Sequence, residues 1–167
     1  MDIRPANQDD VPAIASIHSA SWRDAYSGFL PADYLAGQVE LDLQAYWAQQ
    51  EILAQDVVLV ADTPDGPAGF VAVWCRPSPF VDNLHVSPSR RSRGIGAALM
   101  RAAAGRLIAL GHSTAYLWVF ESNVAAIRFY ERLGAVKARR AMKEFFGQSV
   151  LCVRMEWSDL HATGEEG

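Results

Sequence analysis

The sequence predicts a single α/β domain built on a mixed, mostly antiparallel sheet with helices on both faces. The chain has 167 residues, which is a common size for one domain. Half of the residues are hydrophobic, enough for a sizeable core. Strand and helix patterns follow the order β-α-α-β-β-β-α-β-α-β-β. Hairpins therefore flank a central strand–helix–strand crossover, which is typical of a mixed sheet.

The N-terminal part is expected to hold one short strand and two helices. The strand covers residues 2–6. Apolar residues at steps of three and four predict a helix over residues 7–26, which Asn7 or Asp9 can cap. A second helix is expected over residues 32–53, with a break near Gly37.

Strand patterns dominate the middle of the chain. Residues 57–62 and 67–76 form a hairpin around a Pro- and Gly-containing turn, and a third strand over 80–88 ends at Pro88. A helix over 95–111 follows, with Gly111 as its C-terminal cap. The remaining elements are expected at 113–120 (strand), 123–135 (helix with Asn123 as N-cap), 136–146 and 149–157 (a strand pair).

Charge and cysteine content exclude several classes of protein. The net charge is −4, so the basic run Arg90–Arg93 is a local feature that suits a small anion better than a nucleic acid. Cys75 and Cys152 lie in apolar runs without metal-ligand spacing, which indicates reduced core thiols and no metal site. The N-terminus lacks a signal-peptide pattern, and no apolar run is long enough to span a membrane. A cytoplasmic location is expected.

The stretch "RRSRGIGAALM" (residues 90–100) has the properties of an anion-binding loop. Backbone N–H groups at the start of a helix and the helix dipole attract negative charge. Gly94 and Gly96 allow a close approach of the backbone, and arginines add charge-assisted hydrogen bonds. The stretch does not match a nucleotide-hydrolysing P-loop, since no Lys and no Ser or Thr follow the glycines. A dinucleotide-binding loop is disfavoured because Leu99 stands where a small residue is expected.

Two motifs resemble those of the GNAT superfamily of acetyl-CoA-dependent N-acetyltransferases. Arg91-x-x-Gly94-x-Gly96 resembles its R/Q-x-x-G-x-G/A loop. Downstream, the pattern N-x-x-A-x-x-F-Y-x-x-x-G-F is matched by Asn123, Ala126, Phe129, Tyr130 and Gly134. Ala135 departs from it where the family usually has an aromatic residue. These blocks lie within residues 80–135.

The resemblance implies an acyl-CoA N-acyltransferase fold, expected in one domain over residues 1–160. The polar residues 161–167 are expected to form a disordered tail. The sheet would be splayed between the parallel strands that contain Leu84 and Trp118. Acetyl-CoA would lie in this gap and on the loop. Its implied contacts are Leu84, His85, Val86, Arg91, Ser92, Arg93, Gly94, Ile95, Gly96, Ala97, Asn123, Ala126, Phe129 and Tyr130.

The resemblance also implies roles in acetyl transfer. Tyr130 would act as the general acid on the leaving thiolate, and the Val86 N–H would stabilise the oxyanion. The general base stays open between Asp82, Glu121 and a chain of water molecules. Strict alternation along strand 80–88 would place Asp82 on one face with Leu84 and Val86, and His85 on the other.

The acceptor site would be built from the first two helices and the last hairpin. Trp22, Tyr26, Phe29 and Tyr34 are candidates for an aromatic wall that holds a cationic amine, and Asp24 or Asp33 would add negative charge. Trp118 and Glu121 are expected beside this wall. A small-molecule primary amine is the expected acceptor. The alternatives are a protein N-terminal or lysine acetyltransferase and a non-catalytic acyl-CoA-binding regulatory module. A homodimer is compatible with the family.

Overall fold

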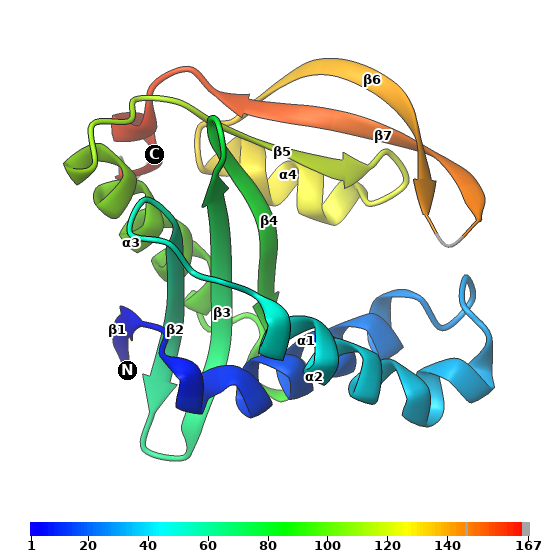
Figure 1. Cartoon of the computed structure of the whole chain (residues 1–167). Coiled ribbons are helices and arrows are strands. Elements are labelled where there is room, and N and C mark those ends of the chain that lie inside the picture. Colours follow the sequence, from blue (N-terminus) through cyan, green and yellow to red (C-terminus); the bar gives the residue numbers. More distant parts are fainter. Residues whose placement is uncertain (146, 165–167) are drawn as a thin grey trace.

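A computed structural model defines the fold and describes residues 1–145 and 147–164. In this part of the chain, seven strands form one sheet with the order β1-β2-β3-β4-β5-β7-β6 (Figure 1). Neighbouring strands run antiparallel except β4 and β5, which run parallel. The strands are β1 (Asp2–Pro5), β2 (Val57–Thr63), β3 (Gly66–Cys75), β4 (Pro79–Val86), β5 (Ala115–Phe120), β6 (Val136–Phe145) and β7 (Gln148–Trp157).

Helices cover both faces of the sheet, so the predicted fold class is confirmed. The helices are α1 (Val11–Ala25), α2 (Val39–Gln49), α3 (Ile95–Ala109) and α4 (Val124–Arg132). α1 and α2 pack on β2 and β3 in a core around Phe70. α3 and α4 pack on the opposite face, in a core with β5 and β7 around Met155. Both cysteines are buried and free, as predicted.

Local sequence signals explain where the helices begin and end. Asn7 caps a 3-10 turn that leads into α1: its side chain accepts from the N–H of Asp9 at 2.8 Å, and the carboxylate of Asp10 accepts from the N–H of Asn7 at 2.8 Å. This reciprocal arrangement satisfies two free donors. Gly111 follows α3 with a φ of 90°, a left-handed conformation that glycine adopts without steric cost. The predicted break near Gly37 is a π-helical turn, Tyr34–Gln38, ahead of α2.

The parallel strands β4 and β5 meet at one point only. Phe80 and Tyr116 are their single pair in register, and the two rings stack with centroids 5.1 Å apart. Beyond this pair the strands diverge (Figure 1). The sheet is therefore splayed where the sequence resemblance implied.

A β-bulge at Asp82 changes which side chains share a face of β4. Val81 pairs with Val73 of β3, and Asn83 pairs with the preceding residue of β3, so Asp82 has no partner there. An extra residue of this kind breaks the alternation of side chains. The prediction that Asp82 and His85 face opposite sides is wrong: both lie on the α1–α2 side, whereas Leu84 packs toward α3.

The described part of the C-terminal end is a 3-10 turn, Leu160–Gly164. Leu160 and Thr163 are buried, and the turn packs on α3. Residues 165–167 of the expected tail, and Phe146 of the expected final strand pair, lie outside the described residues. None of the described helices has the length and apolar character needed to cross a membrane.

Candidate active site in the gap between two strands

A cavity of about 1580 Å³ follows the gap between β4 and β5. Its walls come from these two strands, from the loop before α3 and the first turn of that helix, and from α1 and α4. The cavity therefore joins the predicted anion-binding loop to the predicted acceptor region.

The loop before α3 presents unpaired backbone N–H groups to one end of this cavity. Ser92 and Gly94 adopt left-handed φ values of 61° and 76°. No side chain caps α3, and the first N–H bonded inside the helix is that of Ala98, to Gly94 O at 3.0 Å. The preceding N–H groups, those of residues 95–97, lack intrahelical partners, as at every helix start. The predicted residues Ser92, Gly94, Ile95, Gly96 and Ala97 all line the cavity.

The arginines of the loop have different surroundings. Arg91 lines the cavity, and its guanidinium donates to the carboxylate of Asp24 and to Ser21 Oγ (3.3 Å), both on α1. Arg90 also lines the cavity and pairs with Asp65 at 2.6 Å. Arg93 is exposed and is not among the lining residues. The structure thus brings Arg91, but not Arg93, to the predicted anion site.

The edge of β4 that faces the gap presents free backbone groups at alternate residues. Ser87 N–H donates to Ala68 O of β3 at 2.8 Å. Since hydrogen-bonded and non-bonded pairs alternate along an antiparallel ladder, His85 bonds toward β3, while Leu84 and Val86 turn their N–H and C=O toward β5. Of the three residues expected to offer backbone groups here, two do so.

The α4 wall carries the predicted second motif. Asn123 caps α4 by accepting from Ala126 N–H at 3.1 Å. Ala126, Phe129 and Tyr130 line the cavity. A Cβ at Gly96 would lie 3.4 Å from the Phe129 ring, so the loop and α4 are in close contact.

Tyr130 lines the cavity, and its ring contacts two other aromatic rings. Its ring makes edge contacts with Phe129 (5.1 Å between centroids) and Trp157 (6.0 Å). Burial raises the pKa of Tyr130 to about 12. Within residues 1–145 and 147–164, no group hydrogen-bonds its hydroxyl. The phenol is therefore protonated at neutral pH and available to a ligand.

Asp82 lies on the β4 wall and is held by three donors. Its Oδ2 accepts from Trp74 Nε1 (2.9 Å), Asn83 Nδ2 (3.0 Å) and, at the limit of hydrogen bonding, Tyr46 Oη (3.5 Å). The side chain is exposed, and it lines the cavity together with Tyr46 of α2. Burial and the nearby carboxylate raise the pKa of Tyr46 to about 12. Asp82 is thus an anchored carboxylate in the wall of the cavity.

An aromatic cluster lies in the region of the cavity that was predicted to hold the acceptor. Tyr26, Phe29, Phe120 and Phe145 contact one another at centroid distances of 5.2–6.2 Å. Trp22 contacts this cluster, and Trp118 also lines the cavity. Tyr34, expected in the same wall, packs against the core between α1 and α2 instead.

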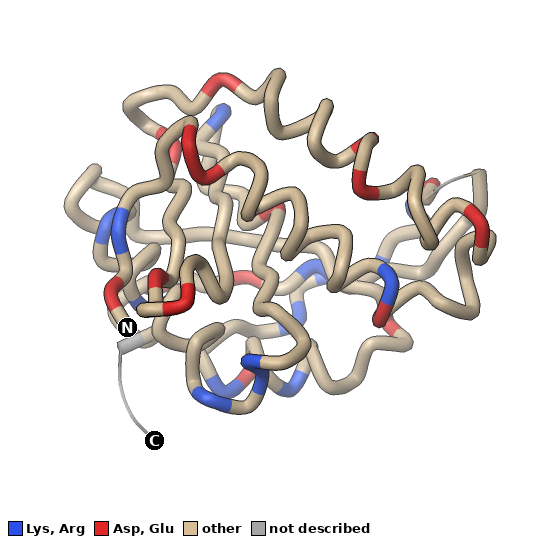
Figure 2. Tube along the Cα trace, turned by 90° about the horizontal axis from the view of Figure 1, so that it is seen from below, with Lys and Arg blue, Asp and Glu red and all other residues tan. Residues whose placement is uncertain are grey.

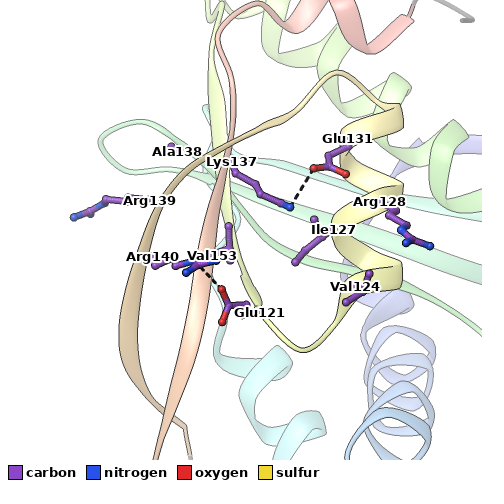
Figure 3. A pocket seen from close by; sticks show the side chains of 10 residues that line it. All are labelled: Glu121, Val124, Ile127, Arg128, Glu131, Lys137, Ala138, Arg139, Arg140 and Val153. Atoms are coloured by element: carbon purple, nitrogen blue, oxygen red, sulfur yellow. Dashed lines mark ion pairs between the residues drawn. The ribbon is translucent and has the colours of Figure 1, made fainter.

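Glu121 is separated from this cavity. It lines a smaller pocket of about 450 Å³ between α4 and β6, where its Oε1 lies 2.7 Å from Arg140 Nε (Figure 3). Lys137 pairs with Glu131 at 3.5 Å in the same pocket. The structure therefore places Glu121 at the contact between α4 and β6, whereas Asp82, the other carboxylate considered as a general base, lines the cavity.

Two histidines connect α1 to β4. The rings of His18 and His85 stack with centroids 4.4 Å apart. His18 Nδ1 accepts a hydrogen bond from Trp47 Nε1 at 3.1 Å. His85 Nδ1 lies 2.9 Å from Ser21 Oγ. Burial lowers the pKa of His18 to about 4. Burial also holds the pKa of His85 well below its usual value, and the nearby His18 and Arg91 lower it further. Both rings are neutral at pH 7.

Arg101, Arg132 and Tyr46 are among the lining residues that were not predicted from the sequence. Arg101 lies four residues after Ala97, which puts it on the same helical face, so that spacing was a usable signal. Arg132 and Tyr46 carry no such signal, because only the packing of α4 and α2 brings them to the cavity. Along the whole trace, basic and acidic positions are interspersed (Figure 2), which suits a local anion site better than a broad basic face.

Comparisons with known proteins agree with this geometry. A family model described as "Acetyltransferase (GNAT) family" matches residues 14–135. An uncharacterized N-acetyltransferase, YuaI of Bacillus subtilis, is 27% identical over 96% of this chain and 94% of its own length. An uncharacterized N-acetyltransferase of Archaeoglobus fulgidus is 31% identical over 78% of this chain and 89% of its own length.

Solved structures share the fold. The yncA protein of Salmonella typhimurium, solved with its cofactor acetyl-CoA, has a TM-score of 0.73 at 19% identity and covers 96% of this chain and 94% of its own. A GCN5-related N-acetyltransferase of Rhodopseudomonas palustris has a TM-score of 0.74 at 21% identity, over 93% of each chain. With the loop, the splayed sheet and the family match together, the chain belongs to the GNAT acetyltransferase family.

Proposed function

We propose that the protein is an N-acetyltransferase that moves an acetyl group from acetyl-CoA to the primary amine of a small molecule, within one ternary complex. The observation that carries this proposal is the continuity of the cavity. It runs from the free N–H groups at the start of α3, along the free edge of β4, to Tyr130 and the aromatic acceptor end.

The donor end suits the diphosphate and pantetheine parts of CoA. Backbone N–H groups of residues 92–97 and the α3 dipole provide the positive potential that a diphosphate requires. Arg91 supplements them, with Arg101 and Arg132 on the adjoining walls. Leu84 and Val86 offer an extended backbone edge that an amide-containing arm can pair with as an added strand.

The bound thioester supplies the activated acetyl group, and the chain provides the proton transfers. In the reaction an N–C bond forms to the acetyl carbon and the C–S bond breaks. The Val86 N–H faces the gap and stabilises negative charge on the thioester oxygen. Tyr130 Oη gives its proton to the departing sulfur. Asp82, directly or through water, receives the proton that the amine loses.

The experiment compares Tyr130→Phe with wild type for acetyl-CoA binding by calorimetry and for thiol release with a panel of amines. We expect unchanged affinity and a kcat lower by about 100-fold, the range of general acid catalysis. Tyr116→Phe is the matched control, because Tyr116 stacks on Phe80 outside the cavity lining. Full activity of Tyr130→Phe in a chemistry-limited assay would refute the assigned acid, and absence of acetyl-CoA binding by wild type would refute the proposed function.

A further inference from the structure

The face of the sheet beside the acceptor end carries two cations without acidic partners. Lys143 Nζ lies 4.2 Å, and Arg139 Cζ 5.3 Å, from the centre of the Trp118 ring. Neither forms an ion pair with any acidic side chain that the structure describes. Arg154, the third cation on this face, stacks on Tyr116 and is neutralised by Glu156 at 2.5 Å.

A second β-bulge places these charges on the same face of the sheet as Trp118. Lys137 pairs with Met155 of β7 and Arg139 with the preceding residue, Arg154, so Ala138 is the extra residue of β6. A bulge reverses the facing of the side chains that follow. Lys137 and Arg140 consequently point to α4 (Figure 3), while the guanidinium of Arg139 lies against the Trp118 ring.

The opposite charge lies across the gap. Asp82 and Trp118 each lie two residues past the paired residues Phe80 and Tyr116, on parallel strands and on the same face of the sheet. Both line the same cavity. The acceptor end thus has a carboxylate on its β4 wall and the aromatic cluster between α1 and the sheet, while Lys143 and Arg139 lie outside the lining residues, against the Trp118 ring of the β5 wall.

This arrangement is complementary to a molecule that carries both charges and an apolar part. We infer that the acceptor is a small amine that also bears a carboxylate, whose amine is directed to Asp82 and whose carboxylate is bound by Lys143 and Arg139. This inference rests on the proposed function. A free polyamine would meet like charge at Lys143 and Arg139, and like-charge contacts in a site disfavour a partner.

The test measures kcat/KM for matched amines that differ by one carboxylate. The pairs are L-phenylalanine and phenethylamine, L-leucine and 3-methylbutylamine, and 6-aminohexanoate and hexylamine, which together vary the separation of the two charges. L-phenylalanine amide is added because it resembles the N-terminal residue of a peptide. We expect the carboxylated member of at least one pair to be preferred by about 10-fold or more, the lower end for a hydrogen bond to a charged group.

The double variant Arg139→Ala, Lys143→Ala is expected to abolish that preference and to leave kcat/KM for the carboxylate-free amine within about 3-fold. The control is Lys137→Ala, Arg140→Ala, which removes the same charges from the other face of the same strand and should retain the preference.

Three results would overturn the inference: no preference for a carboxylated amine in any pair, an equal loss in the control variant, or faster transfer to the peptide-like amide. If wild type binds acetyl-CoA and acetylates the simple amines equally well, the carboxylate inference fails while the proposed function stands. If acetyl-CoA is not bound, the proposed function itself fails.

Discussion

Ser92 offers a direct test of the geometry of the anion-binding loop. It has a left-handed φ of 61°, which costs a residue with a Cβ about 1–2 kcal/mol. Glycine removes this strain but adds about 0.5–1 kcal/mol of conformational entropy to the unfolded chain. The difference predicts that Ser92→Gly raises the free energy of unfolding by about 0.5–1 kcal/mol, or the melting temperature by about 1–4 °C for a domain of this size.

Thermal and chemical denaturation would measure this effect. Ser92→Ala is the control at the same position: it keeps the Cβ and therefore the strain, and should leave stability nearly unchanged. Ser89→Gly is the control in the same loop, and it should lower stability because Ser89 lies in a 3-10 turn without a left-handed φ. The reasoning is refuted if Ser92→Gly is no more stable than Ser92→Ala.

Three further predictions concern binding and stability. Asp24→Asn frees Arg91 from its partner on α1. Acetyl-CoA binding, measured by calorimetry, should tighten by about two- to five-fold, the size expected for an exposed ion pair. Weaker binding would show that the ion pair supports the site. Burial lowers the pKa of His18 to about 4, against 6.5 in the unfolded chain. Wild type should therefore lose about 3 kcal/mol of its free energy of unfolding as the pH falls from 6.5 through 4. Denaturation curves of His18→Gln should lack this loss. Gly69→Ala places a Cβ 2.9 Å from a backbone oxygen of β4 and should lower the free energy of unfolding by about 1–3 kcal/mol. The control Gly105→Ala has open space around its Cβ in α3 and should raise the free energy of unfolding by about 0.5–1 kcal/mol. Equal effects of the two substitutions would refute the packing argument.

The donor side was predictable because its signals are local in sequence. Gly94 and Gly96 mark the turn into α3, and Asn123 marks the start of α4, so the two motifs could be placed on their elements without knowledge of the sheet. The same locality explains why the order of helices and strands along the chain was predicted correctly. Hairpin turns and capping residues define these elements within a few positions of one another.

The acceptor side was less predictable because it depends on strand register. The bulges at Asp82 and Ala138 arise from pairing with β3 and β7, and no pattern within β4 or β6 reveals them. They decide that Asp82 shares a face with His85 and that Arg139 faces Trp118. Glu121, by contrast, follows a correctly predicted strand, yet its side chain turns to Arg140 on a strand that is distant in the sequence.

A crystal structure with acetyl-CoA bound is the most direct test of the central claim. The diphosphate should accept hydrogen bonds of about 2.7–3.2 Å from backbone N–H groups between Ser92 and Ala97, with Arg91 beside it. The thioester sulfur should lie within reach of Tyr130 Oη, and its carbonyl should face the Val86 N–H. A diphosphate bound away from this loop, or a thioester separated from Tyr130 by protein atoms, would contradict the account.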